Sequence, residues 1–128
     1  MNKLISAGKI TGVLIIILGL IHDIATFTPL IQDGLECLST GNFNAMTYMS
    51  LICGTSLILS GSLIIILLNK VKEFTWLNFP ILLISCFLLL NGILSVLYMS
   101  NNPFAWLTFL LCSVMFLITL LLRKGGRN

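Results

Sequence analysis

The chain has 128 residues, of which 58% are hydrophobic and only 9% are charged, with a formal net charge of +3 at pH 7 and a mean hydropathy of +1.10. A soluble domain of this size carries about 25% charged residues, so this chain has too little polar surface to cover a globule in water. The composition therefore excludes a soluble globular protein and predicts lipid surroundings. No basic patch interleaves with aromatic residues, so no nucleic-acid partner is expected.

The first apolar segment, at about residues 10–27, is predicted to be a membrane-spanning helix. Lys3 and Lys9 precede it, which resembles the start of a secretory signal peptide. No small-residue cleavage site follows the apolar run, however, so we interpret it as a retained span.

A short helix is predicted in the long loop that follows, between Thr28 and about Asn44. Thr28 followed by Pro29 is typical of a helix N-terminus. Apolar residues then recur at helical spacing opposite Gln32 and Glu36, and Gly41 ends the pattern. An amphipathic helix of this kind is expected to lie on the membrane interface.

Three further apolar segments, at about residues 45–68, 77–99 and 104–122, are predicted to be spans two, three and four. Each is close to the roughly 20 residues needed to cross a hydrocarbon core of about 30 Å. Lipid offers no hydrogen bonds to the backbone, so these segments must be helices. The short connections between them make consecutive spans antiparallel neighbours. We therefore predict an all-α membrane protein, an antiparallel four-helix transmembrane bundle forming a single transmembrane domain over residues 1–128.

The basic residues predict how the chain is threaded, because they are retained on the cytoplasmic side during insertion. In a four-span chain, all Lys and Arg residues fall in segments on one side: Lys3, Lys9, Lys70, Lys72, Arg123, Lys124 and Arg127. Three of the four acids, Asp23, Asp33 and Glu36, lie in or next to the first loop of the other side. Both termini are thus expected in the cytoplasm, and the expected location is a cell membrane, specifically a bacterial cytoplasmic membrane.

His22 and Asp23 are the strongest candidates for a functional site, since ionisable residues within a span are costly and mark function by default. If span one begins near Ile10, they lie about 18–20 Å along the helix and still within the outer half of the membrane. If it begins at Leu4 and Lys9 extends to the surface, the span can end at Ile21 and the two residues lie at the water interface. Both interpretations remain open. A pair of this kind could sense or relay protons.

Small residues at helical spacing predict where the spans contact one another, because they let helix backbones approach closely. Span one carries Gly8, Gly12 and Gly19, span two carries Ser50, Gly54 and Gly61, and span three carries Gly92. His22 follows the stripe of span one, so we expect it to face the bundle.

Polar residues on the other spans complete the candidate pocket or proton relay. The full set is His22, Asp23, Tyr48, Asn91, Ser95 and Tyr98. An asparagine deep in a span must find a partner, so packing is the favoured role for Asn91, with a ligand or ion contact as the alternative.

Catalytic, metal and cofactor sites are not expected. The four cysteines include no CxxC pair and lack the spacing of a zinc site or a disulfide framework. We assign no catalytic residue, no metal ligand and no cofactor.

Three functions follow in order of preference. The first is a non-enzymatic accessory or interaction subunit that contacts itself or another membrane protein within the bilayer. The second is a small oligomeric transporter or channel with an outward-facing polar pocket near His22 and Asp23. The third, an enzyme acting on a lipid or quinone, lacks the necessary group of site residues.

Overall fold

Four long helices dominate the computed structural model, which describes residues 1–125. The elements in chain order are α1 (Asn2–Ala25), α2 (Pro29–Gln32), the 3-10 turn η1 (Asp33–Leu35), α3 (Thr40–Lys70), the 3-10 turn η2 (Thr75–Leu77), α4 (Asn78–Tyr98) and α5 (Pro103–Gly125). No strand occurs within residues 1–125. The four long helices are each long and apolar enough to cross a membrane. The prediction of an all-helical chain with four long apolar helices is therefore confirmed.

The helices extend beyond the apolar segments that the sequence marks. α1 begins at Asn2 rather than near Ile10, and α3 begins at Thr40 rather than Ala45. The 31 residues of α3 give it a length of about 46 Å. Hydropathy detects only the apolar part of a helix, whereas backbone hydrogen bonding continues into polar flanks until a cap ends it. Ser39 is that cap for α3, since its side chain accepts a hydrogen bond of 3.5 Å from Asn42 N.

The predicted helix in the first long loop is present but short. α2 covers only four residues before the backbone tightens into η1. Gly34, which lies within η1, has low helix propensity and explains why the regular helix does not continue. Gly41, expected to end this helix, instead belongs to the first turn of α3.

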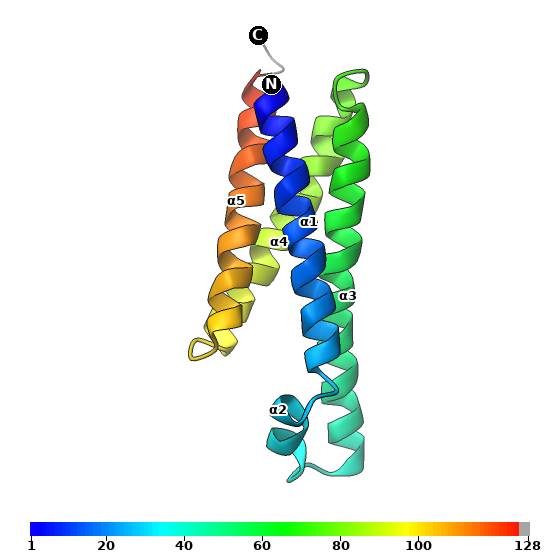
Figure 1. Cartoon of the computed structure of the whole chain (residues 1–128), viewed down its shortest axis with the longest axis vertical. Helices are drawn as coiled ribbons and strands as arrows, with labels where there is room; N and C mark the ends of the chain where they lie inside the picture. The colour runs from blue at the N-terminus through cyan, green and yellow to red at the C-terminus, as the bar shows by residue number, and fades with distance from the viewer. Residues whose placement is uncertain (126–128) are drawn as a thin grey trace.

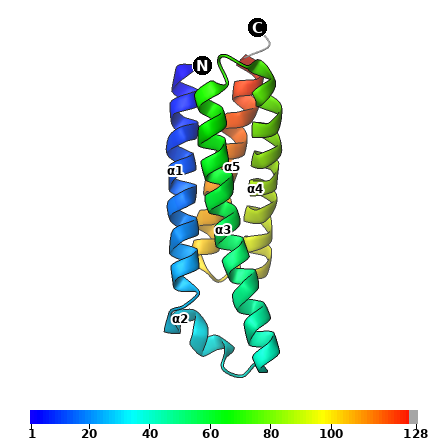
Figure 2. The same cartoon turned by 90° about the vertical axis from the view of Figure 1, so that its right-hand side faces the viewer.

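The four long helices form an antiparallel bundle, with the start of α1 and the end of α5 at the same end of the molecule (Figure 1). α1 packs most closely on α3, and α4 on α5, while α3 and α4 make the sparsest contact between chain neighbours. We call the end that holds the start of α1, the end of α5 and the α3–α4 connection the basic end, because it carries Lys3, Lys70, Lys72, Arg123 and Lys124. Arg127 lies outside the described residues. The opposite end is called the α2 end, where α2 and the first turns of α3 project past the α4–α5 turn (Figure 2).

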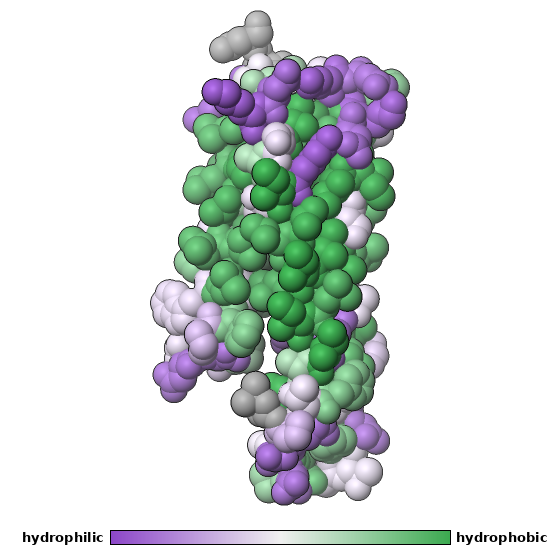
Figure 3. All heavy atoms as spheres, viewed as in Figure 1, coloured by the Kyte–Doolittle hydropathy of each residue, from purple (hydrophilic) through white to green (hydrophobic). Residues whose placement is uncertain are grey.

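All four long helices contribute aliphatic side chains to the core. Ile15 of α1, Ile64 of α3, Leu88 of α4 and Met115 of α5 are fully buried. Exposed apolar side chains on all four long helices form a belt around the bundle. On the face seen in Figure 3, the middle is apolar and polar residues gather at the two ends. Such a belt has the character that a hydrocarbon solvent favours, and it follows from the low charged fraction of the sequence.

Candidate functional site

Two pairs of glycines bring the backbones of α1 and α3 into direct contact. A Cβ added to Gly19 would lie 2.7 Å from the carbonyl oxygen of Gly54, and one added to Gly54 would lie 2.9 Å from the oxygen of Gly19. A Cβ added to Gly61 would likewise lie 2.8 Å from the oxygen of Gly12. No real Cβ approaches a neighbour this closely, so only glycine fits. This is the close approach that small residues permit between membrane helices.

The spacing of these pairs sets the register of the two helices. Within each helix the two glycines are seven residues apart, which is about two turns. Since the helices are antiparallel, Gly12 faces Gly61 and Gly19 faces Gly54. Continuing along α1 for one more turn brings His22 and Asp23 opposite the part of α3 around Ser50.

The other small residues predicted to line helix contacts also lie between helices. A Cβ on Gly8 would meet the side chain of Leu68 on α3 at 2.8 Å. A Cβ on Gly92 of α4 would lie 2.9 Å from Phe109 Cα on α5. Ser50 uses its hydroxyl in the polar contacts of His22. The small-residue stripe of α1 is thus occupied by α3 of the same chain.

His22 belongs to a hydrogen-bonded group between α1 and α3, which we call the His22 cluster: His22, Thr26, Gln32 and Ser50. Ser50 Oγ lies 3.2 Å from His22 Nε2 and 2.7 Å from Thr26 Oγ1. Thr26 Oγ1 donates to the carbonyl oxygen of His22 at 3.0 Å, and Thr26 is only 1% exposed. Gln32 Nε2 donates to the carbonyl oxygen of Thr26 at 2.5 Å, which ties α2 to the end of α1.

The hydrogens available in this cluster bear on which ring nitrogen of His22 carries a hydrogen. Each hydroxyl carries one hydrogen. Thr26 gives its hydrogen to the His22 carbonyl, so Ser50 must donate to Thr26. The contact between Ser50 Oγ and His22 Nε2 is then a hydrogen bond only if Nε2 carries a hydrogen. When all three contacts are hydrogen bonds at once, the proton of a neutral His22 lies on Nε2.

Asp23 lies beside this cluster and packs its carboxylate against α3. Its Oδ2 accepts a hydrogen bond of 3.3 Å from Thr55 Oγ1. Its Oδ1 lies against the Cα of Gly54, at the place that a Cβ would fill. Oδ1 is buried and has no hydrogen-bond partner among residues 1–125. The absence of a side chain at Gly54 thus leaves room for two groups, the backbone of Gly19 and the carboxylate of Asp23.

Asn91 forms a second polar group, between α3 and α4. Cys53 Sγ donates to Asn91 Oδ1 at 3.7 Å, and Asn91 Nδ2 donates to Ser56 Oγ at 3.4 Å. Ser56 Oγ in turn donates to the carbonyl oxygen of Cys53 at 2.8 Å. Asn91 therefore bridges α3 and α4, the consecutive long helices with the sparsest contact.

The remaining candidates lie apart from these groups. Ser95 Oγ donates to the carbonyl oxygens of Gly92 at 2.8 Å and Ala105 at 3.1 Å, which places it between α4 and α5. Tyr48 and Tyr98 are 65% and 84% exposed, and neither makes a side-chain hydrogen bond within residues 1–125. The structure thus brings His22 and Asp23 together against α3 and distributes the other four candidates over separate places.

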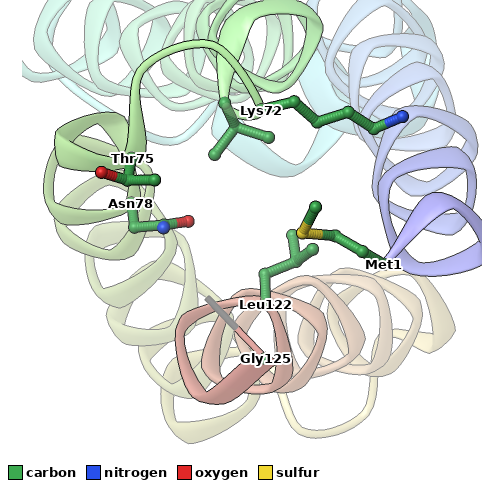
Figure 4. A pocket seen from close by; sticks show the side chains of 7 residues that line it. Met1, Lys72, Thr75, Asn78, Leu122 and Gly125 are labelled. Atoms are coloured by element: carbon green, nitrogen blue, oxygen red, sulfur yellow. The ribbon is translucent and has the colours of Figure 1, made fainter. Parts of the chain in front are cut away.

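A cavity of about 250 Å3 lies at the basic end, far along the bundle from His22 and Asp23 (Figure 4). It is lined by Met1, Val71, Lys72, Thr75, Asn78, Leu122 and Gly125. None of the six candidate pocket residues contributes to it. Sequence patterns do not predict this cavity, because its polar residues fall in and beside a short loop whose lysines indicate topology alone.

No family model, no curated protein and no solved structure matches this chain. Within residues 1–125 no group of three or more His, Cys, Asp or Glu side chains is placed to hold a metal ion. The contacts described above are hydrogen bonds between helices at the α2 end, and a cationic and an amide side chain line the cavity at the basic end.

Proposed function

We propose that this protein is a four-span integral membrane protein that acts as a non-enzymatic accessory or interaction subunit, with both termini in the cytoplasm. Four helices are long and apolar enough to cross a membrane. The basic residues at one end support the orientation, because such residues are retained on the cytoplasmic side. The proposed location is a cell membrane, which in a bacterium is the cytoplasmic membrane.

The observation that carries the subunit role is the engagement of the polar side chains. His22 reaches Ser50 and Asp23 reaches Thr55, both across the α1–α3 contact. Asn91 is used in the same way between α3 and α4. These polar side chains stabilise the packing of the helices, as interhelical hydrogen bonds commonly do in membrane bundles. Such a role suits a structural subunit.

The position of α1 favours an interfacial place for His22 and Asp23. With the helix beginning at Asn2, about 20 residues span the distance from Leu4 to Asp23, which matches a hydrocarbon core of about 30 Å. α2 and the first turns of α3 then extend into the headgroup layer and the water on the outer side. The carboxylate and the imidazole can both contact water there, which lowers the free-energy cost of placing ionisable groups in a spanning helix.

The surface left for a partner is on α4. The glycines of α1 are occupied by α3, whereas α4 has the smallest buried share of the four long helices. Its exposed side chains include Phe79, Leu83, Leu90 and Leu97. We propose that this face contacts lipid in the isolated subunit and another membrane protein, or a second copy of this chain, in the assembly.

Native mass spectrometry after gentle extraction from the source membrane tests the subunit role. A stable complex with a second polypeptide or a homo-oligomer is the expected result. Leu90→Trp on α4 should weaken that complex, while the same change at Leu14, exposed on α1, should leave it intact. A monomer that carries a retained small molecule, with no polypeptide partner, would contradict the subunit role.

One observation favours a second function, a small transporter or channel that uses His22 and Asp23. The buried Oδ1 of Asp23 has no hydrogen-bond partner among residues 1–125. Buried carboxylate oxygens normally have one, so a proton or a cation is a chemically suitable occupant. Proton flux into liposomes that contain the purified protein tests this alternative. Asp23→Asn and His22→Ala should both abolish the flux if the pair relays protons, and an absence of flux in the unaltered protein would exclude the relay.

A further inference from the structure

The cavity at the basic end has an apolar floor and a polar rim. Val71 and Leu122 supply its buried apolar lining, being 6% and 3% exposed. The amide of Asn78 points into the opening, and the side chain of Lys72 runs along its rim (Figure 4). Its volume of about 250 Å3 falls below the roughly 300–1,000 Å3 of sites for drug-sized ligands, so it suits a small group.

The polar side chains around the cavity are not engaged with other protein groups. Neither Lys72 nor Asn78 makes a side-chain hydrogen bond or ion pair within residues 1–125. The neighbouring Lys70, by contrast, is paired with Glu73 at 3.1 Å. Ammonium and amide groups are donors, so an occupant rich in oxygen acceptors suits this rim.

The electrostatic surroundings favour an anion. Five cationic side chains lie at this end within residues 1–125, and Glu73 is the one acid among them, which leaves a net charge of +4. The ion pair with Lys70 already neutralises Glu73, so no described acid opposes Lys72. In a membrane this end lies at the level of the lipid headgroups, where basic pockets between spanning helices bind anionic lipids.

We propose that this cavity binds the phosphate group of an anionic phospholipid, with Lys72 and Asn78 donating hydrogen bonds to the phosphate oxygens. Val71 and Leu122 provide the apolar surface for the carbon atoms next to the phosphate ester. Free inorganic phosphate has the same chemistry at the binding atoms. The inference rests on the proposed insertion of the bundle in a membrane, which brings the cavity to the headgroup layer.

Lipid retention by the purified protein tests this site. The protein is titrated in mixed micelles with phosphatidylglycerol or phosphatidylcholine, and bound lipid is counted by native mass spectrometry. We expect selective retention of phosphatidylglycerol. Lys72→Gln and Asn78→Ala should each weaken it, by about tenfold for the lysine, which is the effect of losing one charge-assisted hydrogen bond.

Lys124→Gln is the matched control, because it removes one charge at the same end from a residue that does not line the cavity. We expect its effect to stay within about twofold. An effect as large as that of Lys72→Gln, or no effect of either cavity variant, would overturn the site and assign lipid retention to the general surface charge. Unchanged helicity in circular dichroism shows that each variant is folded.

A second titration, with inorganic phosphate in phosphatidylcholine micelles, distinguishes the two sources of the anion. Phosphate binding that Lys72→Gln weakens would support the site with a free anion as its ligand. Failure of the folded protein to bind either anion would overturn the site. Failure of the membrane proposal is seen separately, as release of the protein from membranes by alkaline carbonate.

Discussion

At the scale of single residues, Gly54 carries the tightest constraint in the molecule. It contacts both the backbone of Gly19 and the carboxylate of Asp23. The stripe of small residues predicted a close helix contact there, but not that a charged group would share the space. That information depends on the register between α1 and α3, which a pattern within one helix does not contain.

We predict that Gly54→Ala destabilises the bundle by about 1–3 kcal/mol, the usual cost of overpacking a tight contact. The added methyl group would overlap Asp23 Oδ1 and the Gly19 carbonyl oxygen. Unfolding in mixed micelles with increasing SDS measures the loss. Gly41→Ala is the control, since a Cβ at Gly41 meets nothing within 4 Å and alanine favours the helix. Equal stability of the two variants would contradict the contact.

Ser50 is the residue that joins His22 to Thr26. We predict that Ser50→Ala lowers the free energy of unfolding by about 1 kcal/mol, within the range measured for interhelical hydrogen bonds in membranes. Ser62→Ala is its control on the same helix, because within residues 1–125 the Ser62 hydroxyl bonds only to the carbonyl oxygen of Ile58. Nitrogen-15 NMR of the imidazole should find a hydrogen on Nε2 of His22 in the neutral protein, and a neutral Nδ1–H tautomer would refute the proton assignment.

At the scale of elements, the sequence predicted four long apolar helices and a short helix in the first loop, and the structure contains both. Hydropathy reports the apolar part of each helix, so the predicted ends of α1 and α3 fell short of Asn2 and Thr40. The partners of Asn91 could not be predicted, because the contact with Cys53 and Ser56 depends on how α3 and α4 are aligned. The periodicity of a sequence identifies the packing face of each helix, but not which face of another helix it contacts.

Gln32 joins α2 to the end of α1 by a hydrogen bond to the carbonyl oxygen of Thr26, beside the bond from Thr28 Oγ1 to the carbonyl oxygen of Ala25. We predict that Gln32→Ala raises hydrogen–deuterium exchange in residues 29–38 and leaves exchange in the four long helices unchanged. Glu36→Gln serves as a control, since Glu36 is exposed and makes no side-chain hydrogen bond within residues 1–125. Unaltered exchange in the Gln32 variant would mean that other contacts hold α2.

At the scale of the whole molecule, a belt of exposed apolar side chains from all four long helices separates two polar ends, as the face in Figure 3 shows. The distribution of Lys and Arg predicted this polarity from the sequence, because charge position along the chain is enough to decide it in a four-span protein. The cavity at the basic end was not predicted, since it forms only where the ends of the long helices and the α3–α4 connection converge. The subunit role and the lipid site both depend on the proposed insertion and orientation in the membrane.

Labelling of Cys37 tests the proposed orientation most directly. Cys37 is exposed at the α2 end, whereas Cys86 is exposed within the apolar belt and Cys112 is buried. A membrane-impermeant maleimide applied to intact spheroplasts should label the protein at Cys37, and Cys37→Ser should abolish that labelling. A cysteine introduced by Lys72→Cys at the basic end, in the Cys37→Ser background, should react only after the membrane is opened. The reverse order of reactivity, or labelling of both ends from outside, would contradict a four-span bundle with its basic end in the cytoplasm.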